Sequence, residues 1–386
     1  MYKSDRNDKI SVQRRSALLL SEIERRERIM TEWKHNYIKK DAVTLRNFFR
    51  HLKMNAKVPL ELRDYVIILV LLPVFFLRFI HWGFDRYLCK DKNASKMVDS
   101  YANRFSADLT SVDIRPGRCI TILHRSPEPI NGSPRGLIIF VHGSCARMQQ
   151  LVALMDGFFN RGYEIIAYDA LGCGLSSKPV GEALYFTGEM YEDMTAVICK
   201  YTSERGKMAT CVMGHSFGGA MVTKFAASSE SSSLCMSAVS LCQPAGLTAH
   251  KKAMSIFKYP ISVLWLIRPL LGLKARELLF GPKATEELRR QEREASARNP
   301  VHMFRSFYNG YDISFFSPDV VGTELHIPVL FLGAECDRVC PAADVKAVAD
   351  RFKRSSHYRI VRECGHQCMQ EDPAQVMDLV TNFLVR

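Results

Sequence analysis

The chain has 386 residues, of which 47% are hydrophobic, so it can hold one α/β domain of about 200–250 residues plus an appendage. Its formal net charge of +13 favours anionic partners such as membrane surfaces, nucleic acids or acidic substrates. The sequence has no zinc-finger spacing, no aromatic signature of ribonucleoprotein domains and no helix-turn-helix pattern. We therefore expect a membrane surface and no nucleic acid as partner.

Residues 1–64 are rich in charge and have helical periodicity in places, which predicts a solvated, basic helical arm. Acidic residues from Asp5 onward argue against a signal peptide. Residues 65–84 are hydrophobic, beginning with the uncharged run YVIILVLLPVFFL and continuing past Arg78 and His81. The run is shorter than the roughly 20 apolar residues that span a bilayer, so we expect a shallow membrane-associating helix. A membrane span and a buried core helix are the alternatives, and the flanking charges define no orientation.

From residue 117 to residue 386 the pattern alternates between strand and helix. Predicted strands cover residues 117–123, 137–141, 164–168, 209–213, 236–241, 328–332 and 357–361. Such alternation predicts an α/β fold with a mostly parallel sheet and helices on both faces. Residues 245–325 interrupt it and form an insertion.

Residues 214–218 read Gly-His-Ser-Phe-Gly, between a predicted strand and a predicted helix. This is the G-x-S-x-G pattern of a nucleophile elbow in its strand–turn–helix context, with Ser216 as the nucleophile. Bulky residues at 214 and 218 would clash with the adjacent strand and helix. The alternative is a chance pentapeptide in a β–α–β unit.

A serine nucleophile needs a base and an acid that orients the base, and the elbow predicts the chain order Ser, acid, His. Asp337 follows the strand at 328–332, and His366 follows the strand at 357–361, so both belong to loops at the carboxyl edge of the sheet. We expect the catalytic triad to be Ser216, Asp337 and His366. Glu335 is the rival acid.

An oxyanion hole needs two backbone N–H groups. Phe217, directly after the nucleophile, should provide one of them, and Ser144 in the loop after strand 137–141 should provide the other. His142 precedes the elbow, so we expect it to brace this loop by hydrogen bonds rather than to act as the base.

The chain resembles the α/β-hydrolase-domain family of eukaryotic membrane-associated serine hydrolases over about residues 136–386. The matching stretches are FVHGS (140–144), GYEIIAYDALGCGLSS (162–177), GHSFGG (214–219), FLGAECDRVCP (331–341) and ECGHQCMQEDP (363–373). The resemblance implies the same triad, a structural role for Asp169 and a helical cap at 245–325. Some members carry an H-x-x-x-x-D acyltransferase motif, but Glu371 holds the place of its aspartate, so acyl transfer is not supported. A serine at 216 in place of aspartate argues against an epoxide hydrolase or dehalogenase.

The insertion contains an unusually apolar stretch, which suits an acyl chain as well as ordinary packing of a cap helix. The candidates for contact with substrate are Ile261, Leu264, Trp265 and Ile267. Residues 284–298 by contrast predict a charged helix.

The twelve cysteines are scattered, and a domain of this size needs no disulfide framework. We therefore expect reduced thiols in a membrane-associated protein whose catalytic domain faces the cytosol, although glycosylation-type sequons at Asn93 and Asn131 point the other way. Six cysteines fall in loops of the predicted site, and they are Cys145, Cys173, Cys336, Cys340, Cys364 and Cys368. Two pairs of them, Cys336 with Cys340 and Cys364 with Cys368, have C-x-x-x-C spacing. This spacing is looser than that of structural zinc sites, so incidental packing is preferred over redox sensitivity or zinc.

These patterns predict a serine hydrolase that cleaves carboxylic esters, in particular lipid esters such as acylglycerols or lysophospholipids, through an acyl-enzyme. We expect no cofactor and no metal. A thioesterase with the same triad and a catalytically silent scaffold of the same fold are the alternatives.

Overall fold

The computed structural model describes residues 101–127, 134–179, 181–244, 255–259, 261, 263–264, 267, 277–296, 299–352 and 354–385. The predicted basic arm at 1–64 and the hydrophobic segment at 65–84 lie outside these residues. None of the helices in the described ranges is both long and apolar enough to cross a membrane.

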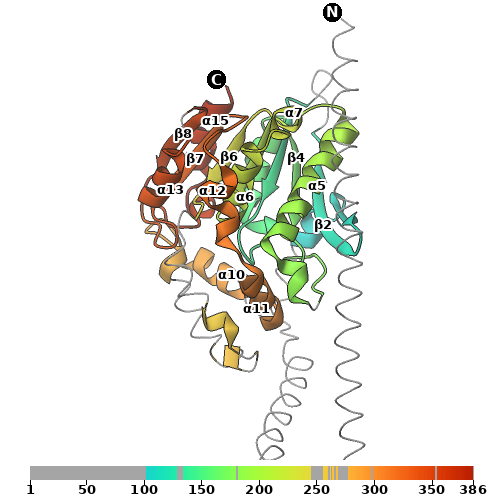
Figure 1. The fold of residues 1–386 in the computed structure, drawn as a ribbon, viewed down its shortest axis with the longest axis vertical. Coiled ribbons are helices and arrows are strands. Elements are labelled where there is room, and N and C mark those ends of the chain that lie inside the picture. The colour runs from blue at the N-terminus through green and yellow to red at the C-terminus, as the bar shows by residue number, and fades with distance from the viewer. Residues whose placement is uncertain are drawn as a thin grey trace, which may run out of the picture. The chain divides into compact units, whose positions relative to one another are not determined.

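Eight strands form one sheet in the order β1-β2-β4-β3-β5-β6-β7-β8 (Figure 1). Strand β2 is antiparallel to β1 and β4, and every other neighbouring pair is parallel, which confirms the predicted α/β fold with a mostly parallel sheet. The strands are β1 (Leu109–Arg115), β2 (Arg118–Arg125), β3 (Leu137–Val141), β4 (Glu164–Asp169), β5 (Cys211–His215), β6 (Ala238–Leu241), β7 (Val329–Ala334) and β8 (Ser356–Val361). Strand β1 precedes the predicted start of the domain at residue 117.

Helices cover both faces of the sheet. Side chains of a strand alternate between the two faces, and all five residues of β3 are buried, so neither face of this strand is open to solvent. Helices α4 and α15 contact one another on a core that includes Ile138 and Phe140, and α5 contacts α6 and α7. The helical elements outside the insertion are η1 (Met148–Leu151), α4 (Val152–Phe159), η2 (Glu182–Tyr185), α5 (Thr187–Arg205), α6 (Phe217–Ala226), α7 (Ser231–Leu234), α13 (Ala342–Ala349), α14 (Cys368–Glu371) and α15 (Pro373–Leu384).

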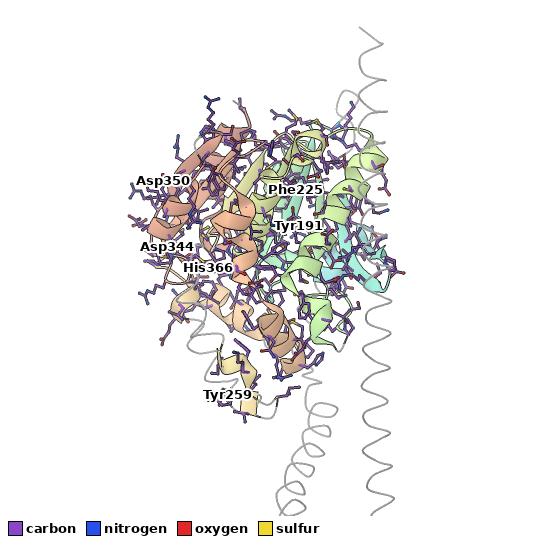
Figure 2. The ribbon with its side chains drawn as sticks, viewed as in Figure 1. Tyr191, Phe225, Tyr259, Asp344, Asp350 and His366 are labelled. Carbon is purple, nitrogen blue, oxygen red and sulfur yellow. The ribbon has the colours of Figure 1, made fainter. Side chains whose placement is uncertain are left out.

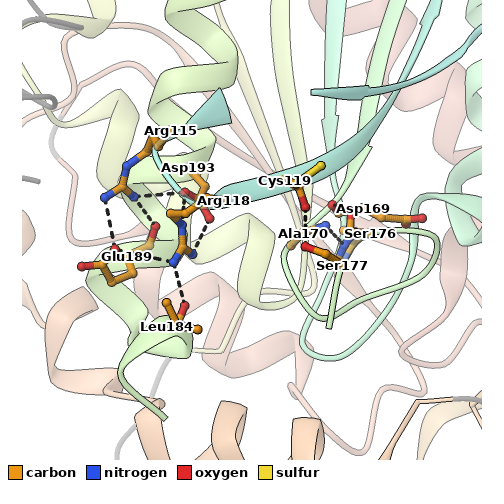
Figure 3. Close-up of polar contacts among 11 residues, drawn as sticks. Arg115, Arg118, Cys119, Asp169, Ala170, Ser176, Ser177, Leu184, Glu189 and Asp193 are labelled. Atoms are coloured by element: carbon orange, nitrogen blue, oxygen red, sulfur yellow. Dashed lines mark hydrogen bonds and ion pairs between the residues drawn. The ribbon is translucent and has the colours of Figure 1, made fainter. Parts of the chain in front are cut away.

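Buried ion pairs hold the β1–β2 hairpin against α5 (Figure 3). Arg118 donates from Nε and Nη2 to the two carboxylate oxygens of Asp193, each at 2.5 Å. Arg115 donates from Nη1 to Asp193 Oδ1 at 3.0 Å and pairs with Glu189 at 3.1 Å. Because the side chain of Asp193 is only 1% exposed, this carboxylate depends on both arginines for the charge and hydrogen bonds that burial removes.

The insertion at 245–325, called the cap below, lies between β6 and β7 in the chain, and its described elements lie beyond the carboxyl edge of the sheet (Figure 1). Its described elements are η3 (Ser255–Lys258), α10 (Glu286–Ser296), α11 (Val301–Gly310), η4 (Ile313–Phe316) and α12 (Pro318–Val321). Helix α10 corresponds to the charged helix predicted at 284–298. The cap therefore stands at the edge where the loops after β3, β5, β7 and β8 meet.

Candidate active site

Ser216 occupies a strained turn between β5 and α6. Its backbone angles are φ 53° and ψ −118°, a conformation that costs a non-glycine residue free energy. The Ser216 N–H donates to the carbonyl of Leu241 on the neighbouring strand at 2.8 Å, which holds the turn in place. The strand continues through His215, so it ends two residues later than predicted and leads directly into the serine.

Two glycines make this turn possible. A Cβ atom at Gly214 would lie 2.3 Å from the carbonyl oxygen of Gly218, and one at Gly218 would lie 2.6 Å from the carbonyl oxygen of His142. Both distances are far shorter than a van der Waals contact, and both involve backbone atoms that cannot move aside. The glycines of the elbow pattern therefore have the steric role that the sequence suggested.

His366 and Asp337 lie against each other, with His366 Nδ1 2.8 Å from Asp337 Oδ2. The other oxygen, Asp337 Oδ1, accepts from the backbone N–H groups of Val339 and Cys340, both at 2.8 Å. Burial raises the pKa of Asp337, but the His366 ring and these hydrogen bonds outweigh it, so the net pKa is lowered. An ionised Asp337 accepts the Nδ1–H of a neutral imidazole, which leaves Nε2 as the basic nitrogen. Figure 2 shows His366 on the side of the sheet that faces the cap.

The rival acid Glu335 points elsewhere. Its carboxylate pairs with Arg362 at 3.0 Å and accepts from the backbone N–H of Glu363 at 2.9 Å. Its side chain is 40% exposed, whereas that of Asp337 is fully buried. Of the two acids in this loop, the structure brings only Asp337 to His366.

His215 is a residue that sequence reasoning missed, although it lies within the elbow pattern. Its Nε2 lies 2.8 Å from the carbonyl oxygen of His366, and the two rings are 4.8 Å apart between centroids. Burial, with the neighbouring His366, lowers the pKa of His215 to about 3, so the ring is neutral at physiological pH. A neutral ring that donates from Nε2 ties the elbow to the loop that carries His366.

The loop after β3 passes close to Ser216. A Cβ atom at Gly143 would lie 3.1 Å from Ser216 Cβ and 3.2 Å from His215 Nδ1, so only glycine allows this approach without a shift of its neighbours. Ser144, the predicted oxyanion donor, follows directly. Phe217 is the first residue of α6, where backbone N–H groups have no partner within the helix. This placement is compatible with the predicted pair of oxyanion donors, Ser144 and Phe217.

Both ring nitrogens of His142 are engaged in this loop. Nδ1 lies 2.8 Å from the carbonyl oxygen of Gly143, and Nε2 accepts from the backbone N–H of Ala170 at 2.9 Å. Burial lowers the pKa of His142. A neutral ring with both nitrogens in use braces the loop and cannot serve as a base for Ser216.

Asp169 supports the same loop from the end of β4. Its carboxylate accepts from the backbone N–H groups of Met148 and Leu175, both at 2.7 Å. The loop that follows is tied back by Ser176, whose hydroxyl donates to the Asp169 carbonyl and accepts from the N–H of Thr121 (Figure 3). These contacts give Asp169 the structural role that the resemblance implied.

The sequence model of the family described as "Serine aminopeptidase, S33" matches residues 132–373, which include the elbow, Asp337 and His366. The chain belongs to this α/β-hydrolase family. Among the relatives of this α/β hydrolase, Protein ABHD8 of mouse is 27% identical over 281 residues, covering 70% of this chain and 61% of the mouse protein. Human Protein ABHD8 is 27% identical over 254 residues, covering 64% of this chain and 55% of the human protein. The match thus spans less than two-thirds of the length of these relatives.

Solved structures show the same fold. An esterase from Exiguobacterium antarcticum superposes with a TM-score of 0.59 at 16% identity, covering 72% of this α/β hydrolase and 99% of the esterase. A bromoperoxidase from Bacillus anthracis superposes with a TM-score of 0.59 at 15% identity, covering 72% of this chain and 100% of that protein. At such identities the likeness is one of fold.

Aromatic side chains of the cap of this α/β hydrolase pack on the residue after the nucleophile. The Phe217 ring lies 5.4 Å from Phe307, 5.2 Å from Tyr311 and 5.7 Å from Phe316, measured between centroids. The sequence suggested a different part of the cap. There Leu264 is 2% exposed, Ile261 and Ile267 are half-buried, and Trp265 lies outside the described residues.

The eleven cysteines among the described residues are all free thiols. Cys242, which the sequence did not single out, has its Sγ 3.8 Å from Cys368 Sγ. Its Sγ also groups with ligand atoms of Asp337 and His366, all within 4.8 Å of one another. Burial raises the pKa of Cys145, Cys340 and Cys364, so these loop thiols are protonated at neutral pH.

Proposed function

We propose that this α/β hydrolase is a serine hydrolase that cleaves carboxylic esters through an acyl-enzyme. The observation that carries the proposal is the buried Asp337–His366 pair at 2.8 Å, tied through His215 to a serine in a strained strand–turn–helix elbow. Nucleophilic acyl transfer by a serine requires a histidine that is oriented by a buried acid, and Asp337 is such an acid for His366.

In the proposed reaction, Ser216 Oγ attacks the ester carbonyl while His366 Nε2 takes the hydroxyl proton. Asp337 holds the Nδ1–H, and its negative charge stabilises the imidazolium that forms. The carbonyl oxygen, now negative, is bound by the N–H groups of Ser144 and Phe217. His366 then returns the proton to the leaving alcohol, and a water molecule repeats the sequence to release the carboxylic acid.

We infer that the acyl group is apolar, which makes lipid esters the substrate class. In support, aromatic side chains of the cap pack on Phe217 directly beside the nucleophile, and the predicted contact residue Leu264 is buried. Glu371, at the place of the acyltransferase aspartate, has a structural role, because its carboxylate accepts from the N–H groups of Gly281 and Gly365, both at 3.0 Å. This supports hydrolysis rather than transfer to a second acceptor.

We also propose that residues 65–84 attach the protein to a membrane surface, in line with a lipid substrate and a net charge of +13. Basic residues near an anionic leaflet contribute about 1 kcal/mol each, and a buried apolar helix face adds to this. Full-length protein should float with anionic liposomes and be released by carbonate if the segment is a shallow helix, whereas a span should resist carbonate. Protein that ignores anionic liposomes would contradict membrane attachment.

The test of the enzymatic proposal is labelling by a fluorophosphonate probe together with turnover of esters of graded chain length. Ser216→Ala should abolish labelling and lower turnover by about three orders of magnitude or more, with the fold unchanged. If acyl length is read by the cap, Leu264→Ala should lower the specificity constant for long chains more than for short ones, by roughly 1 kcal/mol per methylene lost from contact.

The same assays separate the alternatives. Faster turnover of thioesters than of matched oxoesters would make the protein a thioesterase with the same residues in the same roles. Folded wild-type protein that neither binds the probe nor turns over any ester would overturn the proposal in favour of a silent scaffold.

A further inference from the structure

Helix α10 of the cap carries a buried acid, Glu292. Glu292 is 7% exposed, whereas Glu287 on the same helix has a side chain that is 55% exposed and accepts from Arg290 and Gln291 of that helix. A buried carboxylate is costly unless several donors satisfy it, so the partners of Glu292 define what it does.

Glu292 accepts hydrogen bonds from three side chains of the hydrolase domain. Arg147 donates from Nη2 to Oε1 at 2.6 Å, Gln370 donates to the same oxygen at 2.9 Å, and Gln150 donates to Oε2 at 2.8 Å. Arg147 is itself 7% exposed, so its charge relies on the same contact. The pair is a buried, charge-assisted contact between segments that lie far apart in the chain.

These partners come from the two loops that should carry out the chemistry. Arg147 belongs to the loop that begins with Gly143 and Ser144, and Gln370 belongs to α14, directly after His366. One carboxylate of the cap therefore connects the proposed oxyanion loop with the histidine loop. A second hydrogen bond also holds the proposed oxyanion loop to the cap: Asn299 Nδ2 donates to the carbonyl of Cys145 at 2.7 Å. Cys145 has a backbone φ of 50°.

We propose that Glu292 is a positioning residue. Through Arg147 it holds the oxyanion loop, and through Gln370 it holds the histidine loop, so that the two loops keep a fixed position relative to each other. This inference rests on the proposed serine hydrolase function. Catalysis by backbone N–H groups depends on their distance from the developing oxyanion, and a misplacement of about 1 Å costs on the order of 100-fold in rate. Glu292 touches no reacting atom and acts only through these loops.

The variant that tests this is Glu292→Gln. The amide oxygen can still accept from Arg147 and Gln370, but it carries no negative charge, so the buried guanidinium of Arg147 loses its counterion. The new NH₂ group then faces Gln150, which must turn its own amide to accept, so the contact to the oxyanion loop is weakened. The cap remains attached elsewhere, since Gly281 N–H donates to Glu371 and Gln367 N–H donates to the carbonyl of Leu279. Glu287→Gln is the matched control, an identical change on the exposed face of the same helix.

We expect Glu292→Gln to lower kcat for a short-chain ester by about 10- to 100-fold, with KM changed less than about twofold. The inhibition constant of an alkyl boronic acid, which loads the oxyanion hole, should rise by a similar factor, because a transition-state analogue reports the same contacts. Glu292→Asp should recover part of both, and Glu287→Gln should match the wild type.

Should Glu292→Gln fail to fold, the double change Arg147→Met with Glu292→Leu removes both buried charges together and should restore stability without restoring kcat. The positioning role would be overturned if Glu292→Gln or the double variant folded and had the kcat and boronate affinity of the wild type. Glu292 would then only attach the cap. That outcome differs from failure of the proposed function, in which the wild type itself would not react with a fluorophosphonate.

Discussion

Replacing Asp337 by asparagine tests the acid–base pair with almost no change in shape. In the native protein the N–H groups of Val339 and Cys340 both donate to Oδ1, and Oδ2 faces His366 Nδ1 at 2.8 Å. In the variant, the two backbone donors will hold the oxygen of the new amide at the Oδ1 place, so the amide NH₂ must face His366. The ring can then accept only at Nδ1, and its proton moves to Nε2.

The size of the effect follows from this change of tautomer. An Nε2–H group cannot take the proton of Ser216, so the base is lost while the oxyanion loop and the elbow stay intact. The equivalent change in serine proteases lowers kcat by about four orders of magnitude, which corresponds to roughly 5 kcal/mol in the activation barrier. We expect Asp337→Asn to lose activity by about this factor.

The assay is the initial rate of hydrolysis of a soluble short-chain ester, measured alongside denaturant unfolding to show that the variant is folded. Glu335→Gln is the control, since Glu335 lies in the same loop but pairs with Arg362 on the surface. It should keep wild-type activity. The reasoning would be refuted if folded Asp337→Asn kept more than about a tenth of the activity, or if Glu335→Gln lost as much.

Three further predictions concern stability, each measured by denaturant unfolding. Gly218→Ala places a Cβ atom 2.6 Å from a backbone oxygen and should destabilise the protein by about 1–3 kcal/mol or more. In the control Gly188→Ala the new Cβ would lie 3.8 Å from the Phe315 ring, so this variant should be neutral or slightly stabilising. Equal effects of the two changes would contradict the steric account. Asp193→Asn removes the more deeply buried of the two carboxylates that both arginines share and leaves Glu189 as their counterion, so it should cost about 3 kcal/mol. A loss below about 1 kcal/mol would mean that Glu189 and other groups satisfy the arginines. The pKa of His215 is about 3 in the folded protein and near 6.5 in the unfolded chain. Between pH 6.5 and pH 3, roughly, only the unfolded chain therefore binds a proton at His215. The free energy of unfolding should fall as the pH drops through this range, by at most about 1.4 kcal/mol per pH unit. His215→Gln should flatten this slope, and an unchanged slope would assign the acid sensitivity to other groups.

The parts of this protein that short stretches of chain specify were predictable from the sequence. Strand β3 has the predicted ends, residues 137 and 141, because its continuous apolar run is bounded by a glycine and by the histidine–glycine turn. The elbow was predictable for the same reason. Its steric demands fall on Gly214 and Gly218, which lie two residues from the serine and can be recognised without any knowledge of distant contacts.

Contacts between distant segments were predictable only where the chain order Ser, acid, His pointed to them, as for Asp337 and His366. Strand β1 lies at the edge of the sheet and has several exposed positions, so its pattern of apolar and polar residues is weak. The strand is held by Arg115, whose partner Asp193 lies on α5. Glu335 and Asp337 are two acids in one loop, and the sequence favoured Asp337 without showing which contacts separate the two. The path of the loop past the end of β8 decides this, since it places one carboxylate in the interior and the other beside Arg362.

The same distinction applies to His215 and Glu292. Local sequence determines which backbone conformation a residue adopts, because sterics and hydrophobic periodicity act over a few neighbouring positions. Their hydrogen bonds, from His215 to the His366 carbonyl and from Arg147 and Gln370 to Glu292, join segments far apart in the sequence. Such partners meet only after the strand order has brought the loops of the parallel strands to one edge, and only burial at that edge makes a polar group depend on one particular partner.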